Sequence, residues 1–207
     1  VVLDQPPWPS SWRVRDIAKL VGPFYPDWNQ RVFEELCGWA GVSWRLKVKE
    51  FSRGMGMKMQ LAVALAHEAE LLVLDEPTSG LDPLARGELL DMLSEFMTSE
   101  RHSVLFSTHI TSDLDRIADM VTILDAGRVI ASGSREDLLE TWVMVRGGVA
   151  DLTDGLSSRV RGLRRHSVGW EGLLPAADLG LCGPGVVAET PSIEELLVHL
   201  AKERKDA

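Results

Sequence analysis

The stretch LLVLDEPTSGLDP, residues 71–83, constrains the fold more than any other part of the chain. Four apolar residues, Leu71–Leu74, run directly into two carboxylates, Asp75 and Glu76. A continuous apolar run of this length predicts a strand buried in a parallel sheet. Neighbouring side chains of a strand point to opposite faces, so one carboxylate can hold magnesium while the other faces an attacking water as its base or orienting group. The alternative is a pair of solvated loop acids after a core strand.

Further strands alternate with helices downstream. Strand patterns recur at Ser103–Ser107 and Val121–Leu124. Between the first two strands, Asp82 predicts a helix cap and Pro83 takes the first helical position, where a missing N–H does no harm. This alternation predicts an α/β layer with a parallel sheet.

The segment before the first strand is predicted to be mostly helical. Asp27, with Gln30 three residues later, predicts the start of a helix that runs through Ala40. Ser52 can cap a second helix, from Arg53 to about residue 68.

The last third of the chain shows a different pattern, of short helices and strands separated by glycine and proline. Ser134 predicts the start of a short helix, and Trp142–Val145 reads as a strand. Ser192, with Glu195 three residues later, predicts the start of a last amphipathic helix, Ile193–Lys202. Glycine and proline punctuate the residues between, so this part is expected to form a small α+β unit.

Composition and charge exclude several classes of protein. A net charge of −9 argues against a general nucleic-acid binder, which carries a basic face. The apolar runs are too short to cross a bilayer, and the sequence shows no secretory signal. Cys37 and Cys182 lie far apart without metal-ligand spacing, which favours two reduced thiols.

Four motifs follow one another over about sixty residues, within FSRGMGMKMQLAVALAHEAE (51–70), LLVLDEPTSGLDP (71–83) and VLFSTHITSDL (104–114). In order they are Phe51-Ser52-Arg53-Gly54-Met55, Leu71–Glu76, Ser79-Gly80-Leu81-Asp82 and Thr108-His109. In this order the chain resembles the ATP-binding subunit of ABC transporters. In that family a signature of the type L-S-G-G-Q opens a helix, a magnesium-site strand ends in D-E, an S-G-L-D turn follows, and a later strand ends in S/T-H.

The signature differs from the family pattern at two positions. Arg53 stands for the first glycine and Met55 for the glutamine, which leaves any role of that glutamine open. Ser52 and Gly54 remain, and a hydroxyl and a bare amide at a helix N-terminus suit a phosphate. The resemblance therefore implies nucleotide contact at Ser52, Gly54 and Met55, while Ser52 can also be a helix cap alone.

The resemblance also implies roles for the other motif residues. Asp75 is expected to hold Mg²⁺ and Glu76 to be catalytic. His109 matches the family histidine that contacts the terminal phosphate and the attacking water, although a lone histidine there would more often be a satisfied strand-end residue. Asp82 matches the acid of the family's turn at the subunit interface and is expected to help bind the nucleotide.

The phosphate loop of such proteins, G-x-x-x-x-G-K-[ST], is absent from the sequence. The chain has six lysines, and none of them follows a glycine. In the family this loop precedes a strand that ends in a short glutamine-bearing loop, and Val1–Gln5 looks like the end of that strand and this loop. The chain is therefore expected to begin after the phosphate loop, with Gln5, or Asp4 by a one-residue shift, as the magnesium-sensing and nucleotide-binding position.

Five of the seven tryptophans fall within the first 44 residues. They can form the core of a helical subdomain. They can also line a groove for a partner helix, because exposed aromatic side chains mark interfaces. By resemblance, this region receives a helix of the membrane-spanning subunit.

The expected fold class is α/β, a partial P-loop NTPase of the ABC type. It comprises a helical subdomain with the signature (1–68), the downstream half of the ATPase core with its parallel sheet (69–133) and a small α+β extension (134–207). The resemblance implies an ATP- and Mg²⁺-dependent ATPase subunit of an export-type bacterial transporter. It would sit in the cytoplasm on the inner face of the membrane, bound to a transmembrane permease and to a second ATP-binding subunit, identical or not, without nucleic acid. The alternatives are an ABC-type ATPase of translation or DNA maintenance, and a non-catalytic partner-binding fragment.

Overall fold

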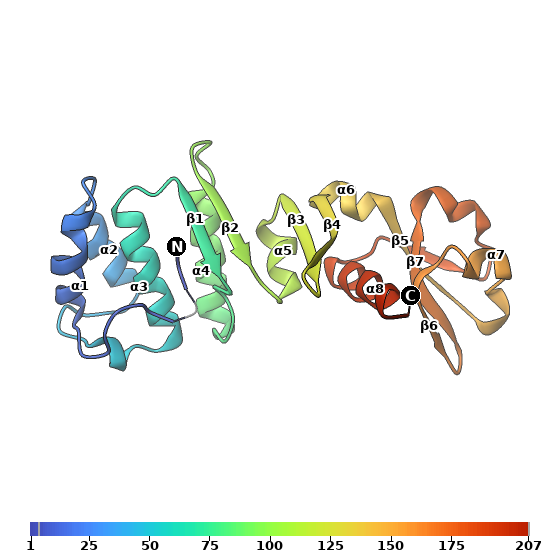
Figure 1. The fold of residues 1–207 in the computed structure, drawn as a ribbon, viewed down its shortest axis with the longest axis horizontal. Helices are drawn as coiled ribbons and strands as arrows, with labels where there is room; N and C mark the ends of the chain where they lie inside the picture. Colours follow the sequence, from blue (N-terminus) through green and yellow to red (C-terminus); the bar gives the residue numbers. More distant parts are fainter. Residues whose placement is uncertain (4, 207) are drawn as a thin grey trace. The chain divides into compact units, whose positions relative to one another are not determined.

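The computed structural model describes residues 1–3 and 5–206, and it forms two compact units, Val1–Ile110 and Thr111–Ala207 (Figure 1). The division falls just after the predicted Thr108-His109 motif. The finer three-part organisation, with boundaries after residues 68 and 133, stays a prediction.

The first unit combines a group of helices with a short parallel sheet. Its helices are α1 (Val14–Val21), η1 (Gly22–Phe24), α2 (Gln30–Trp39), η2 (Val48–Glu50), α3 (Arg53–Ala66) and α4 (Pro83–Phe96), and its strands are β1 (Leu71–Asp75) and β2 (Ser103–Ser107). The strands run parallel in the register Leu71↔Ser103 to Asp75↔Ser107. The predicted parallel pairing is therefore confirmed for these two strands. It is wrong for the third predicted strand, Val121–Leu124, which pairs antiparallel with the residues that follow it.

The start of the chain extends this sheet on the other side of β1. Val2 forms an isolated parallel bridge with Leu74. Its N–H donates to the carbonyl of Val73 at 2.8 Å, and its carbonyl accepts from the N–H of Asp75 at 3.0 Å. These bonds agree with the interpretation of Val1–Leu3 as a strand end.

Helices α1, α2 and α3 pack around one apolar core, which is the blue to teal part of Figure 1. Its buried members include Ile17 of α1, Phe33 of α2 and Met59 of α3. Four of the five early tryptophans bear on this core: Trp8, Trp12 and Trp28 pack against it half-buried, and Trp44 stacks at a tilt on Phe33.

The predicted start of α2 is wrong by two residues. Asn29, and not Asp27, is the cap: its side-chain oxygen accepts from the N–H groups of Arg31 and Val32, at 3.1 and 3.2 Å. Gln30 instead bonds outward, accepting from the indole N–H of Trp28 at 3.0 Å. The helix ends at Trp39, one residue earlier than expected.

We expect Asn29→Ala to lower the free energy of unfolding by about 1 kcal/mol, because two helix N–H groups lose their acceptor. Asp27→Ala is the matched control and should change it by less than about 0.5 kcal/mol. Urea unfolding of the two variants measures both effects. An equal loss in both would contradict the assignment of Asn29 as the cap.

One face of the parallel sheet is covered and the other is not. Leu72 and Leu74 are buried, whereas Leu71 is 55% and Leu105 is 63% exposed. Strands of parallel sheets are normally buried on both faces. The prediction of a fully buried strand therefore holds for one face of β1 only, since no residue of the described part covers Leu105.

The second unit has its own sheets. Its helices are α5 (Thr111–Ile117), α6 (Arg135–Thr141), η3 (Val149–Asp151), α7 (Asp154–Ser157), η4 (Ala176–Leu181) and α8 (Ile193–Asp206). Its strands are β3 (Met120–Asp125), β4 (Arg128–Ser134), β5 (Trp142–Gly147), β6 (Arg161–His166), β7 (Gly169–Pro175) and β8 (Val187–Glu189). Strands β3 and β4 form a hairpin, and the other four form an antiparallel sheet in the order β6-β7-β5-β8. The predicted α+β character is confirmed, and α8 continues four residues beyond Lys202.

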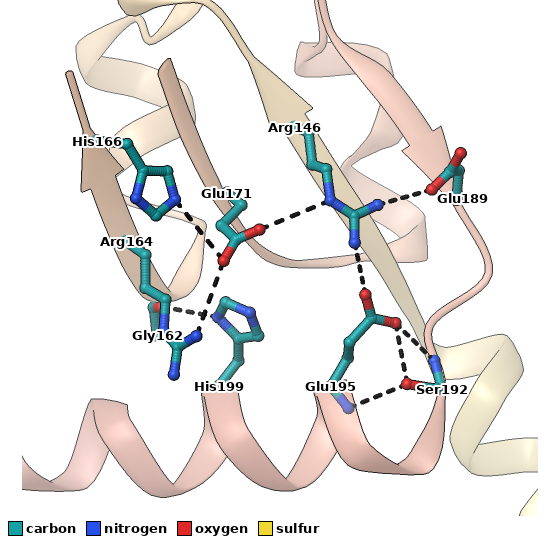
Figure 2. A network of polar contacts seen from close by, with 9 residues as sticks. All are labelled: Arg146, Gly162, Arg164, His166, Glu171, Glu189, Ser192, Glu195 and His199. Atoms are coloured by element: carbon teal, nitrogen blue, oxygen red, sulfur yellow. Dashed lines mark hydrogen bonds and ion pairs between the residues drawn. The ribbon is translucent and has the colours of Figure 1, made fainter. Parts of the chain in front are cut away.

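A polar network joins α8 to this sheet (Figure 2). The Arg146 guanidinium of β5 lies 2.6 Å from Glu189 of β8, 2.5 Å from Glu195 of α8 and 3.6 Å from Glu171 of β7. Glu195 also accepts from the N–H and hydroxyl of Ser192, as the predicted capping box requires. Burial raises the pKa of Glu195, but Ser192 and Arg146 outweigh it, so the pKa lies below its ordinary value.

We expect Glu195→Gln to lower the free energy of unfolding of this unit by about 1 kcal/mol at pH 7. The folded state holds the Glu195 proton less tightly than the unfolded chain. The stabilisation is therefore complete above the ordinary pKa of 4.5 and lost as the pH falls through the lower, folded value. The difference from the wild type should shrink accordingly in acid. Urea unfolding at pH 7 and at a pH below the folded pKa of Glu195, followed by NMR signals of β5 and β7, measures this difference in stability.

Glu194→Gln is the control for this prediction, because Glu194 is exposed at the same helix start. It should change the stability by less than about 0.5 kcal/mol at either pH. A loss for Glu195→Gln that does not depend on pH would refute the ionic role.

No helix in the described residues has both the length and the apolar character needed to cross a membrane.

Candidate functional site

The carboxyl ends of β1 and β2 bring the predicted acidic pair and the predicted histidine together. Asp75 is the last residue of β1 and stands opposite Ser107, the last residue of β2. The Ser107 hydroxyl donates to Oδ1 of Asp75 at 2.6 Å. One oxygen of Asp75 is thereby fixed, and the exposed carboxylate keeps further lone pairs for a cation.

Glu76 adopts an unusual backbone conformation directly after the strand. Its φ is +49°, in the left-handed region that costs a residue with a side chain about 1–2 kcal/mol. The Glu76 N–H donates to the carbonyl of Ser107 at 3.1 Å and lies 3.3 Å from its hydroxyl oxygen. Strained residues held by their neighbours concentrate at functional sites, which supports a special role for Glu76.

Glu76 and His109 form a close pair. Nδ1 of His109 lies 2.7 Å from Oε2 of Glu76. An ionised carboxylate only accepts hydrogen bonds, so Nδ1 is the donor in this contact and Nε2 is the ring nitrogen that remains for another partner. The His109 side chain is 69% exposed and that of Glu76 31%, so both can reach a bound molecule.

The signature residues lie at the first turn of α3. The Ser52 hydroxyl accepts from the N–H of Met55 at 3.2 Å, so the predicted cap is confirmed. The Met55 side chain packs against the helical core and its N–H is bonded to Ser52, so a nucleotide contact at Met55 stays a prediction. Ser52 itself is exposed, and Gly54 is half-buried.

The Ser79–Asp82 turn packs against this first turn of α3. Gly80 has φ +69°, and a Cβ there would lie 3.0–3.2 Å from the Arg53 side chain. A Cβ on Gly54 would lie 3.7 Å from Leu81. Arg53, which departs from the family pattern, therefore contacts the turn that resembles the family's interface turn.

Asp82 is a helix cap, as predicted. Its Oδ1 accepts from the N–H groups of Leu84 and Ala85, both at 3.0 Å, before Pro83 opens α4. One oxygen of its carboxylate is thus bonded to backbone N–H groups of the same chain. A role at a subunit interface stays a prediction.

Gln5 is exposed, beyond the strand end that pairs with β1. Because Val2 bonds to Asp75, the next residues emerge at the sheet edge where Asp75 and Glu76 lie. The alternative magnesium-sensing position, Asp4, lies outside the described residues.

The arrangement fits a magnesium ion held jointly with phosphate oxygens. In the described residues, no group of three or more His, Cys, Asp or Glu side chains is placed to hold a metal by itself. Mg²⁺ keeps several waters and commonly binds through one or two carboxylates plus substrate phosphates. Asp75 can supply that carboxylate.

The cysteines do not contribute a nucleophile. Both are free, and Cys37 is buried with its Sγ 4.0 Å from the Met59 sulfur. Burial and the nearby Glu34 raise the pKa of Cys37 to about 12, and burial also raises the pKa of Cys182. Both thiols therefore stay protonated at neutral pH.

Two residues of this region were missed by sequence reasoning. Ser107 closes the strand before the predicted Thr108-His109 motif, and only the register of β2 reveals that it faces Asp75. Gln60 is a buried polar residue in an apolar stretch of α3, and its side chain binds the backbone of Leu3. A polar residue inside an apolar helix face was the available signal for Gln60.

Comparisons with known proteins find relatives among ATP-binding proteins. The family described as "AAA domain, putative AbiEii toxin, Type IV TA system" matches residues 45–114. The daunorubicin resistance ATP-binding protein DrrA3 of Streptomyces coeruleorubidus is 40% identical over 45% of this chain and 29% of its own length. An uncharacterized ABC transporter ATP-binding protein of Synechocystis is 26% identical over 94% of this chain and 59% of its own length. The homologues of this chain are ABC transporter ATP-binding proteins.

Solved structures agree with this family. An ATP-binding subunit of an ABC transporter is 29% identical, with a TM-score of 0.56 over 66% of this chain and 60% of that one. The cbiO1 protein of Clostridium perfringens, described as part of the ABC transporter complex cbiONQ, shares the fold at 23% identity, with a TM-score of 0.54 over 66% of this chain and 57% of that one. The α/β fold is therefore that of ABC ATP-binding proteins. The chain spans less than two thirds of the length of DrrA3 and of the Synechocystis protein.

Proposed function

We propose that this chain is the downstream portion of an ATP-hydrolysing subunit of a bacterial export-type ABC transporter. The observation that carries the proposal is the cluster at the ends of β1 and β2, where Ser107 holds Asp75 and His109 pairs with Glu76. The names of several relatives, among them a daunorubicin resistance protein and a Nod factor export protein, support the direction of transport.

In this proposal each residue at the strand ends has one task. Asp75, with one oxygen fixed by Ser107, would hold a Mg²⁺ that offsets the charge of the phosphates. Glu76 orients and deprotonates the attacking water, because its carboxylate can accept a proton at a fixed position. His109 holds Glu76 through Nδ1 and presents Nε2 to the terminal phosphate. Gln5 completes the magnesium site from the adjoining strand end.

The signature residues are proposed to act on the nucleotide of a second ATP-binding subunit. The first turn of α3 offers the Ser52 hydroxyl and the backbone N–H of Gly54, with the favourable helix dipole. The proposed dimer places Ser52 and Gly54 of one subunit opposite Asp75 and Glu76 of the other, across ATP. The Ser79–Asp82 turn contacts Arg53, so in this dimer it could couple the nucleotide state of one ATP site to that of the other.

The phosphate loop of this machinery would come from residues outside the sequence, which has no Gly-Lys pair. The uncovered face of the parallel sheet supports this view. Leu71 and Leu105 are the apolar side chains that a further layer of the ATPase core would cover.

The proposed location is the cytoplasmic face of the membrane, bound to a transmembrane permease. Trp8 and Trp12 are half-buried on the helical core and follow the Gln5 segment directly, so a partner helix docked on them could sense the nucleotide. An ABC-type ATPase of translation or DNA maintenance is not favoured, since the relatives are transporter proteins and the charge is −9.

We expect the isolated 207-residue chain to show no specific ATPase activity. The lysine and amides of the phosphate loop offset most of the triphosphate charge, and loss of even one such donor costs about 10²–10³ in rate. A phosphate-release assay measures this. Turnover by the chain alone that disappears in Glu76→Gln would contradict the expectation.

In the full-length subunit, we expect Glu76→Gln to leave ATP binding nearly unchanged and to slow hydrolysis by at least about 10²-fold. Glutamine keeps the size and one acceptor oxygen but cannot take a proton. The variant should therefore accumulate as a dimer closed on ATP. Size-exclusion chromatography with ATP and Mg²⁺, beside a phosphate-release assay, measures both effects.

Two further variants make this experiment specific. Asp75→Asn should lose magnesium-dependent nucleotide affinity as well as rate. Glu100→Gln, an exposed glutamate after α4, is the control and should behave as the wild type. Hydrolysis by Glu76→Gln at the wild-type rate would refute the assignment of Glu76 as the base.

A further inference from the structure

Gln60 clamps the backbone of Leu3. Gln60 is 4% exposed, in the middle of α3. Its Oε1 accepts from the N–H of Leu3 at 3.0 Å, and its Nε2 donates to the carbonyl of Leu3 at 2.8 Å. One side-chain amide thus satisfies both backbone groups of a single residue, as a neighbouring strand would.

Two other contacts fix the same short segment. On one side of Leu3, Val2 is bonded to β1 through Val73 and Asp75. On the other side, Pro6 lies so close to α3 that a Cβ on Gly56 would stand 2.8 Å from its Cγ. Val2, Leu3 and Pro6 are therefore held between β1 and α3.

Each of these contacts flanks Gln5. Leu3 is held two residues before Gln5, and Pro6 directly follows it. The Gln5 side chain itself is exposed. Its position is therefore set by the clamp on its neighbours and by the bond from Asp75 to Val2, and not by packing of Gln5.

We propose that Gln60 is a positioning residue that places Gln5 at the magnesium site, an inference that rests on the proposed function. Its helix begins with Ser52, about two turns away. The clamp therefore ties the signature end of α3 and the magnesium-sensing segment to one rigid element. A shift of α3 moves Leu3, and Gln5 follows.

The role predicts a specific kinetic effect. Without the clamp, Gln5 occupies its place only part of the time, and the apparent affinity for the ion falls by that fraction. In the full-length subunit, Gln60→Met should raise the Mg²⁺ concentration for half-maximal ATP hydrolysis about five- to tenfold. The rate at saturating Mg²⁺ should stay within about twofold. Methionine matches the length of glutamine and suits a buried site but makes neither bond.

Amide hydrogen exchange on the 207-residue chain reads the clamp directly. In Gln60→Met the Leu3 N–H should exchange at least about fivefold faster. Gln60→Glu keeps the acceptor for the Leu3 N–H and loses the donor to its carbonyl, so that N–H should stay protected. Gly56→Ala is a second variant, in which the new methyl group forces Pro6 away from α3 while Gln60 is unchanged. Like Gln60→Met, it should raise the Mg²⁺ concentration needed for half-maximal hydrolysis. It therefore tests the same role if Gln60→Met folds poorly.

Two controls separate positioning from general destabilisation. Met57→Leu changes a residue of the same helix that is only 2% exposed, and should leave the Mg²⁺ requirement unchanged. Gln5→Ala should raise this requirement as Gln60→Met does, and the double variant should be no worse than either alone, because both act through one group.

The outcomes divide clearly. Faster Leu3 exchange with an unchanged Mg²⁺ requirement would make Gln60 a structural residue only and overturn the proposal. Additive effects of Gln5→Ala and Gln60→Met would overturn the claim that Gln60 acts through Gln5. A full-length wild type without ATP hydrolysis would instead overturn the proposed function, and with it this role, although the exchange experiment would still report the clamp.

Discussion

The parallel register of β1 and β2 is the constraint on which the candidate site depends. It sets Ser107 opposite Asp75, residues 32 positions apart, and so allows the hydroxyl to fix the carboxylate. It also delivers the carbonyl of Ser107 to the N–H of Glu76, which holds that residue in its left-handed conformation. A slip of one residue would turn Asp75 or Ser107 to the other face of the sheet and separate Glu76 from His109. The geometry of the candidate site therefore depends first on backbone pairing and only then on its side chains.

Helix α3 is the second support, and its sequence serves several contacts at once. Ser52 caps it, Met59 fills the helical core, and Gln60 holds the strand end that lies beside β1. Gly56 is small because Pro6 lies directly over it. Local and tertiary demands thus agree along one helix, which is the condition under which a sequence specifies a single structure.

The parts of the fold that the sequence could predict are those set by local patterns. Ser52, Asp82 and Ser134 cap helices within three residues of their own position, so a short stretch contains the whole signal. Asp27 was a wrong choice because Asp and Asn are equally good caps, and the contact that decides for Asn29 is geometric. Ser107 and Gln60 could not be assigned, because their partners are brought close only by tertiary structure. The predicted roles in nucleotide chemistry came from the order of motifs, while the Glu76–His109 contact came from the structure alone.

The exposure of the site explains why a second subunit matters to the proposed function. The His109 side chain is 69% exposed and that of Glu76 31%, so the contact between them lies largely in water. Two unit charges 4 Å apart interact by about 1 kcal/mol in water but by about 4 kcal/mol at the effective dielectric of a protein surface. Fixed dipoles stabilise a developing charge well only when competing water is excluded. In the proposed function, the residues at the ends of β1 and β2 therefore still need to be shielded from water. The proposed dimer would supply the shielding, because the Ser52 end of the partner's α3 would close over the same phosphates that Asp75 and Glu76 face.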